Sequence, residues 1–192
     1  MDSVLRGESM AEGQTVLVEM IKRAFGRRKM PASAVDGDAW VDDSDVKDAM
    51  WFSGRDWRGI ALQDWRDHMC AYTFMSAEAG QYYLPSLLIL SAQNPSEWIY
   101  SLDALISELD CTPELGVRDE RIRDRYLGFK ADEYAAIQEW LLFMSENAPD
   151  LGYPTSGVGD KFGRAFALVD LLRKETEALR LVAGDASESD LD

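Results

Sequence analysis

The chain has 192 residues, 46% of them apolar, and its 35 acidic residues against 20 basic ones give a net charge of −15. That length suits one domain with a sizeable core. The charge disfavours direct binding to nucleic acid and favours a cationic partner. The most apolar stretch, Leu84 to Leu90, is far shorter than the ~20 residues that span a bilayer, so we expect no membrane insertion.

The first twelve residues carry little pattern, and we expect a flexible N-terminus over 1–12. Thr15 is placed to cap a first helix, along which apolar residues recur at helical spacing. These apolar residues are Val16, Val18, Ile21, Ala24 and Phe25. We expect the helical domain to cover 13–183 and the acidic tail 184–192 to be disordered.

An acidic segment follows, between Pro31 and a short predicted helix near Ser44 to Phe52. Its acids face a single base, Lys47, and are Asp36, Asp38, Asp42, Asp43, Asp45 and Asp48. A calcium loop that begins at Asp36 would need a glutamate at its twelfth position, where Lys47 stands, so we expect no metal site. With Trp40 and Trp51 nearby, the segment is instead a candidate surface for a cationic partner.

The block from Trp57 to Leu90 predicts two helices joined by a turn. Helical spacing of apolar residues predicts the first, through Leu62, Trp65, Met69 and Tyr72. Ser76 is placed to cap the second, and Pro85 should kink it by removing one backbone hydrogen bond.

The remaining sequence predicts further helices. Apolar residues from Trp98 to Leu109 fit one helix, and alternating charges from Val117 indicate another with internal ion pairs. A third is predicted over Ala131 to Asn147, and a last from about Lys161 to Val182, stopped by Gly184. The fold class is therefore all-α: a compact single-domain bundle of about six to seven helices, one kinked near Pro85.

His68 is the only histidine of the chain, so any acid–base scheme depends on one ring. At helical spacing, Asp64 or the adjacent Asp67 is the carboxylate that would orient it. The two cysteines, Cys70 and Cys111, are expected to be free thiols in a cytoplasmic protein. No cofactor motif is present, and we expect no cofactor.

Several motifs together resemble an uncharacterised bacterial family, a domain of unknown function. They are IKRAF at Ile21 to Phe25, Trp57, FMSAEAGQYYLPSLL at Phe74 to Leu88, and Phe129 before a helix that contains tryptophan. The family is recognisable by an "AF" first helix and a "Tyr-Tyr-Leu-Pro" core, and the match covers about 15–147. Gly80 stands where the family usually has an aromatic residue. The resemblance implies a small bacterial cytoplasmic protein and transfers no catalytic residue.

The leading hypothesis is a non-catalytic bacterial protein that binds a basic toxin or effector and neutralises it by occlusion, as an immunity or inhibitor protein. The acidic segment with Trp40 and Trp51 is the predicted contact surface. Two alternatives stay open: a small-molecule enzyme that uses His68 with neighbouring carboxylates, and an acidic mimic of nucleic acid. The sequence does not indicate the oligomeric state.

Overall fold

A computed structural model describes residues 2–37, 44–97, 99–148 and 158–189. These residues form ten α-helices and one 3-10 helix, and they contain no strand. The all-α prediction is confirmed for the described part of the chain, whereas the predicted number of six to seven helices is wrong. None of the described helices is both long and apolar enough to cross a membrane. The elements are α1 (Asp2–Phe25), α2 (Ser44–Trp51), η1 (Trp57–Gly59), α3 (Leu62–Asp67), α4 (Ala71–Phe74), α5 (Ala77–Gln93), α6 (Tyr100–Leu109), α7 (Pro113–Gly116), α8 (Glu120–Tyr126), α9 (Ala131–Asn147) and α10 (Val158–Ser189).

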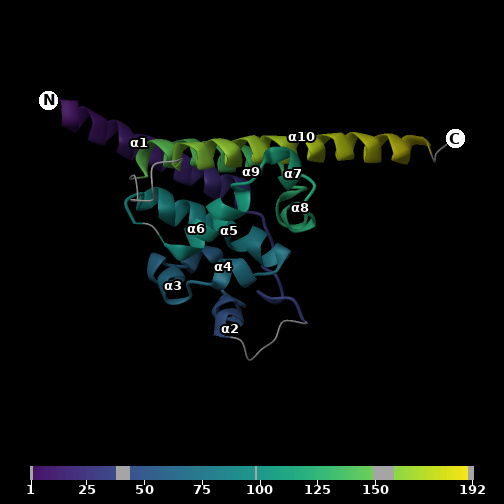
Figure 1. The fold of residues 1–192 in the computed structure, drawn as a ribbon, viewed down its shortest axis with the longest axis horizontal. Helices are drawn as coiled ribbons and strands as arrows, with labels where there is room; N and C mark the ends of the chain where they lie inside the picture. Colours follow the sequence, from purple (N-terminus) through teal and green to yellow (C-terminus); the bar gives the residue numbers. More distant parts are fainter. Residues whose placement is uncertain (1, 38–43, 98, 149–157, 190–192) are drawn as a thin grey trace.

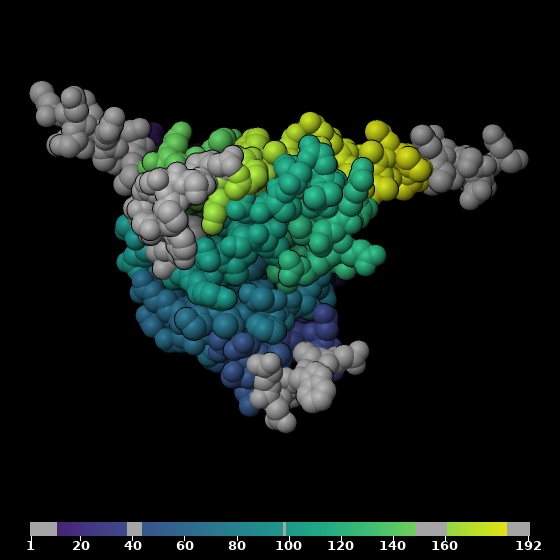
Figure 2. All heavy atoms as spheres, in the orientation of Figure 1, coloured from purple at the N-terminus to yellow at the C-terminus, as the bar shows by residue number. Residues whose placement is uncertain are grey.

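Helix α5 is the centre of the fold, because α1, α6, α8, α9 and η1 all pack against it. Helix α10 lies against α6, α7 and α9 and forms a long rod along one side of the molecule (Figure 1). The C-terminal end of α10 extends beyond the helices beneath it, and in the space-filling view its yellow atoms reach past those of α7 and α8 (Figure 2).

The sequence of α5 explains its central position. Most of its side chains are buried, as expected for a helix that is apolar on nearly every face. Ser76 caps it as predicted, since the Ala79 backbone N–H donates to the Ser76 hydroxyl at 3.2 Å. Pro85 lies inside the helix, which runs from Ala77 to Gln93 without interruption. The kink at Pro85 stays a prediction.

The single helix predicted through Leu62, Trp65, Met69 and Tyr72 is wrong, because α3 ends at Asp67 and α4 begins only at Ala71. His68 has non-helical backbone angles, and Met69 is exposed rather than buried. A tertiary contact stabilises this break: the Cys70 backbone N–H donates to the Asp48 carboxylate of α2 at 3.2 Å. That hydrogen bond replaces one that a continuous helix would have made.

Two helices extend further than their end signals predicted. Thr15 is inside α1 rather than at its N-terminus, and its hydroxyl donates to the Ala11 carbonyl at 2.8 Å. At the other end, α10 continues past Gly184 to Ser189. Both helices therefore enter the terminal segments 1–12 and 184–192, whose flexibility stays a prediction. The prediction of a helix over Ala131 to Asn147 matches α9.

The charged residues of α8 do not pair with one another as predicted. Arg123 instead pairs with Glu175 of α10, and both Arg121 and Arg125 pair with Glu108 of α6. The acidic residues that alternate with these arginines in the sequence are exposed. The arginines themselves join α8 to neighbouring helices. Ion pairs across elements have replaced the expected pairs along one helix.

Arg125 is buried, and its guanidinium ties α4 and α6 to α8. Its Nη2 donates to the Met75 carbonyl at 2.6 Å, and its Nη1 donates to Glu108 at 3.1 Å. This side chain lies against Gly80 of α5, where a Cβ atom would stand 2.9 Å from Arg125 Nε. Arg125 thus occupies the space that an aromatic side chain at position 80 would need.

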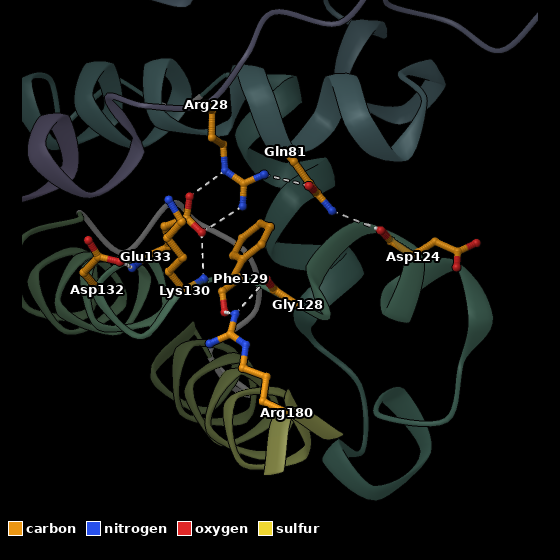
Figure 3. Close-up of polar contacts among 9 residues, drawn as sticks. All are labelled: Arg28, Gln81, Asp124, Gly128, Phe129, Lys130, Asp132, Glu133 and Arg180. Carbon is orange, nitrogen blue, oxygen red and sulfur yellow. Dashed lines mark hydrogen bonds and ion pairs between the residues drawn. The ribbon is translucent and has the colours of Figure 1, made fainter. Parts of the chain in front are cut away.

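A second arginine joins α1 to α9 (Figure 3). Arg28, just after α1, donates to both carboxylate oxygens of Glu133, at 2.7 and 2.9 Å. It also donates to Gln81 of α5 at 2.7 Å, and its guanidinium lies 4.4 Å from the centroid of the Phe129 ring. Glu133 is 2% exposed and accepts the Lys130 backbone N–H as well, which caps the start of α9. We call this arrangement the Arg28–Glu133 clamp.

Replacing Gly80 by alanine should lower the free energy of unfolding by about 1–3 kcal/mol, because the new Cβ atom displaces the buried Arg125 guanidinium. Helix propensity alone would have the opposite effect, since alanine is favoured over glycine inside a helix by about 1 kcal/mol. Gly163→Ala in α10 is the matched control, because nothing lies within 4 Å of its Cβ position and the change should stabilise. Urea denaturation measures both; a Gly80→Ala protein as stable as Gly163→Ala would contradict the role of Arg125.

Glu133→Gln should lower the free energy of unfolding by about 2–3 kcal/mol, because it leaves the Arg28 guanidinium without its buried counter-charge. The control is Glu19→Gln, which breaks the exposed pair with Lys22 and should cost less than about 0.5 kcal/mol. Equal losses in the two variants would mean that the clamp contributes no more than a surface ion pair.

Candidate functional site

The predicted contact surface lies only partly in the described residues. Asp38, Trp40, Asp42 and Asp43 lie outside them. Asp36 is exposed, and Asp45, Asp48 and Trp51 belong to α2, where all three are partly buried. Binding of a partner by this segment stays a prediction.

Asp48 and Trp51 contact other residues of the protein. The Asp48 carboxylate lies 3.3 Å from His68 Nδ1, and its second oxygen accepts the Cys70 N–H. The Trp51 ring stacks on the His68 ring with 4.5 Å between centroids, and the Arg55 guanidinium lies 3.7 Å from the Trp51 centroid. These two members of the predicted surface therefore stabilise the turn between α3 and α4.

The carboxylate beside His68 is that of Asp48, not that of Asp64 or Asp67. The Asp64 side chain accepts the Ala61 backbone N–H at 2.7 Å, and the Asp67 side chain accepts a hydrogen bond from Gln63 at 2.7 Å. Sequence reasoning missed Asp48 because it belongs to another helix. Asp48 lies at the Nδ1 edge of the imidazole, and stacking on Trp51 covers one face of the ring.

Cys111 shows no sign of activation. Both cysteines are partly buried, and neither forms a disulfide bond with a described residue. Burial raises the pKa of the Cys111 thiol, and the nearby charges of Asp119 and Asp110 raise it further. A catalytic cysteine needs the opposite shift. Within the described ranges, no three histidine, cysteine or acidic side chains gather closely enough to hold a metal ion.

A polar cavity of about 270 Å³ lies between α4, α6 and α8, beside Arg125. Its buried carboxylate, Glu108, accepts hydrogen bonds from Arg125 and from the Tyr126 hydroxyl, the latter at 2.7 Å. Burial raises the pKa values of Tyr72 and Tyr126, so both phenols are neutral at physiological pH. The carboxylate is thus already engaged and is poorly placed to act as a base.

A groove of about 750 Å³ lies between α1 and α9, and we call it the α1–α9 groove. Its walls include Glu12, Val16, Met20, Glu139, Leu142 and Glu146. Val16 is 65% exposed and Leu142 is 47% exposed, although the sequence pattern had placed Val16 on the buried face of its helix. Leu17, its neighbour, is buried in its place.

The α1–α9 groove combines apolar side chains with negative charge. Glu12, Glu139 and Glu146 form no ion pair with any described residue, whereas most arginines of the fold have a carboxylate partner. The signal in the sequence was the repeat of Glu12, Val16 and Met20 at four-residue spacing, which defines a face beside the buried one. The arrangement is able to bind a partner that carries both apolar groups and positive charges.

Comparisons of the chain with protein-family models, with curated proteins and with solved structures found no match. The resemblance to a bacterial domain of unknown function stays a prediction.

A hydrogen bond to the turn that follows α2 predicts how the stability of the protein changes in alkaline solution. The Tyr83 hydroxyl donates to the Arg55 carbonyl at 2.9 Å, and burial raises its pKa to about 12 from an ordinary value of 10.0. The folded protein therefore holds this proton more tightly than the unfolded chain. Its contribution to stability is complete below pH 10 and is lost as the pH rises to about 12, by about 1.4 kcal/mol per pH unit.

Tyr83→Phe should therefore reduce the slope of unfolding free energy against pH between pH 10 and 12, whatever its effect at neutral pH. Tyr100→Phe, at an exposed tyrosine, is the control and should leave the slope as it is. Urea titrations at several pH values measure both slopes. The same slope in Tyr83→Phe and in the wild-type protein would refute a tightly held proton at this site.

Proposed function

We propose that this chain is a non-catalytic binding protein that receives a basic, amphipathic segment of another protein in the α1–α9 groove. The observation that carries the proposal is that exposed Val16 and Leu142 line the same groove as three carboxylates. These carboxylates have no ion-pair partner among the described residues. Exposed apolar side chains in a groove are typical of sites that bind protein segments. The negative rim selects a segment with lysine or arginine beside its apolar residues.

The net charge supports the same kind of partner. At −15, the field of the whole chain attracts cations over distances of about a Debye length, ~8 Å at physiological salt, and raises the association rate of a basic partner. Apolar contacts in the groove then slow its dissociation. The acidic segment that includes Asp36 and Asp45 adds to this field without having to touch the partner.

The finer form of the proposal is an immunity or inhibitor protein of the bacterial cytoplasm that neutralises a basic toxin or effector by occlusion. The support for it is the sign of the net charge and a groove that combines exposed apolar side chains with carboxylates. In this form, the bound segment belongs to the cationic surface that the toxin uses on its own target.

A designed peptide tests the groove directly. A helical peptide of leucine and lysine with one apolar face should bind with a dissociation constant in the micromolar range, about −8 kcal/mol. A peptide of the same composition in scrambled order, which has no apolar face, should bind at least about tenfold more weakly, by roughly 1.4 kcal/mol. Fluorescence anisotropy of the labelled peptides measures both constants.

Two triple variants distinguish the effect of the groove carboxylates on binding from the effect of the net charge. Glu12, Glu139 and Glu146 changed together to glutamine should weaken peptide binding by about tenfold or more, since each exposed charge pair contributes up to about 1 kcal/mol. The control replaces Glu78, Glu114 and Glu120, which are exposed acids of α5, α7 and α8, and removes the same charge. Equal effects of the two triple variants, or equal binding of the two peptides, would overturn the proposal.

A further inference from the structure

A second hollow lies between α1, η1 and α5. Its volume is about 320 Å³, at the lower end of the range of ~300–1,000 Å³ typical of small-molecule sites. Apolar side chains of Ile60, Ile89 and Leu90 form part of its wall, and Lys22 and Arg58 bring two positive charges to it. No residue of this cavity belongs to the α1–α9 groove.

Trp57 lines the cavity and has an unpaired donor. Its ring is 3% exposed, and its indole N–H is buried without an acceptor in the described part of the chain. Among the tryptophans that the structure describes, the two others that are buried each have an acceptor: Trp65 donates to the Ser86 hydroxyl at 3.2 Å and Trp140 to the Ser91 hydroxyl at 3.0 Å. A buried donor without a partner costs about 1–3 kcal/mol, and a bound ligand is one of the accepted reasons for retaining it.

Polar neighbours within the protein do not offer this acceptor. Ser86, which also lines the cavity, accepts from Trp65 and donates to the Tyr83 carbonyl at 2.9 Å. Of the other polar side chains in the wall, Lys22 and Arg58 carry only N–H donors, and that of Gln93 belongs to an exposed residue. The two charged residues that line the cavity are thus both cations, although the net charge of the chain is −15; their carboxylate partners, Glu19 and Asp56, are not among the lining residues.

Arg58 is the movable part of the wall. Its guanidinium lies 4.5 Å from the centroid of the Trp57 ring and donates to the Gly26 carbonyl at 2.7 Å, while its side chain is 47% exposed. It also pairs with Asp56 at 3.1 Å, an exposed contact of the kind that contributes little to stability. A side chain held in this way can shift and present its N–H groups to a ligand.

We propose that this cavity binds a small monocarboxylate whose apolar body, a single aromatic ring or a short alkyl chain, packs on Ile60, Ile89 and Leu90 while its carboxylate accepts the Trp57 indole N–H beside Arg58 and Lys22. The charge of the carboxylate matches the two cations, and its oxygens satisfy the unpaired donor. The proposal concerns a different surface from the α1–α9 groove and does not depend on it.

Phenylacetate is the probe, and the indole N–H signals of the ¹⁵N-labelled protein are the readout. The signal that disappears in Trp57→Phe is that of Trp57. Phenylacetate should shift this signal in a saturable manner, with a dissociation constant below about 1 mM, and should leave the Trp140 signal in place. Phenylacetamide, which has the same ring without the charge, should bind about tenfold more weakly or not at all.

Variants identify the contacts. Arg58→Gln should raise the dissociation constant about tenfold, because a charge-assisted hydrogen bond is lost. Arg118→Gln removes an exposed arginine between α7 and α8 and should leave binding unchanged. Trp57→Phe should also weaken the binding of phenylacetate, which calorimetry measures. The substitution retains an aromatic ring, so the variant should fold, and its remaining indole signals will show whether it does.

Four outcomes would overturn the proposal. They are the absence of a saturable shift of the Trp57 signal, equal binding of phenylacetate and phenylacetamide, equal binding by Arg58→Gln and Arg118→Gln, and undiminished binding by a folded Trp57→Phe protein. Binding of a leucine–lysine peptide in the groove is measured separately, so loss of one activity leaves the other to be judged by itself.

Discussion

The bidentate ion pair between Arg28 and Glu133 joins two helices that are distant in the sequence, and both candidate sites depend on the position it gives to α1. Burying the Glu133 carboxylate is costly, and the fold offsets that cost with three donors: two N–H groups of Arg28 and the Lys130 backbone N–H. Gln81 accepts from Arg28 and donates to the Asp124 carbonyl, so the same contact reaches α5 and α8. The ion pair adds to the apolar packing of α1 against α5 and α9, which places the wall that α1 contributes to the groove and to the cavity beside Lys22.

Local signals in the sequence predicted the structure where neighbours along the chain decide the outcome. The Ser76 cap and the bounds of α9 depend on residues within one or two turns, and both predictions are confirmed. The helix through Leu62 and Tyr72 failed for the opposite reason. Its apolar spacing is helical, but Asp48, a residue of another helix, binds the Cys70 N–H and stabilises a turn there. No pattern within the segment could have revealed that contact.

The candidate sites differ from the predicted surface for a related physical reason. Sequence reasoning predicted the binding surface where acidic residues are dense, between Asp36 and Asp48. In the structure, however, Asp48 and Trp51 contact His68. The carboxylates of the α1–α9 groove are sparse in sequence and meet only because α1 and α9 lie side by side. Net charge was predictable from composition, whereas the place where charge meets exposed apolar surface required the fold.

The groove is proposed to bind a cationic segment and the cavity an anion, although residues of α1 line both. The effect of ionic strength on binding distinguishes the two sites. Carboxylates at the groove are exposed, so added salt screens their attraction for a cationic segment and weakens binding there. An anion that approaches the cavity is repelled by a chain of charge −15, and salt screens that repulsion as well. Its affinity must come from short contacts with Trp57 and Arg58 within the cavity, where a charge-assisted hydrogen bond to the buried Trp57 N–H is stronger than in water. Salt should therefore reduce affinity at the groove much more than at the cavity, and the strong negative charge of the chain is compatible with an anion site because that site acts only at short range.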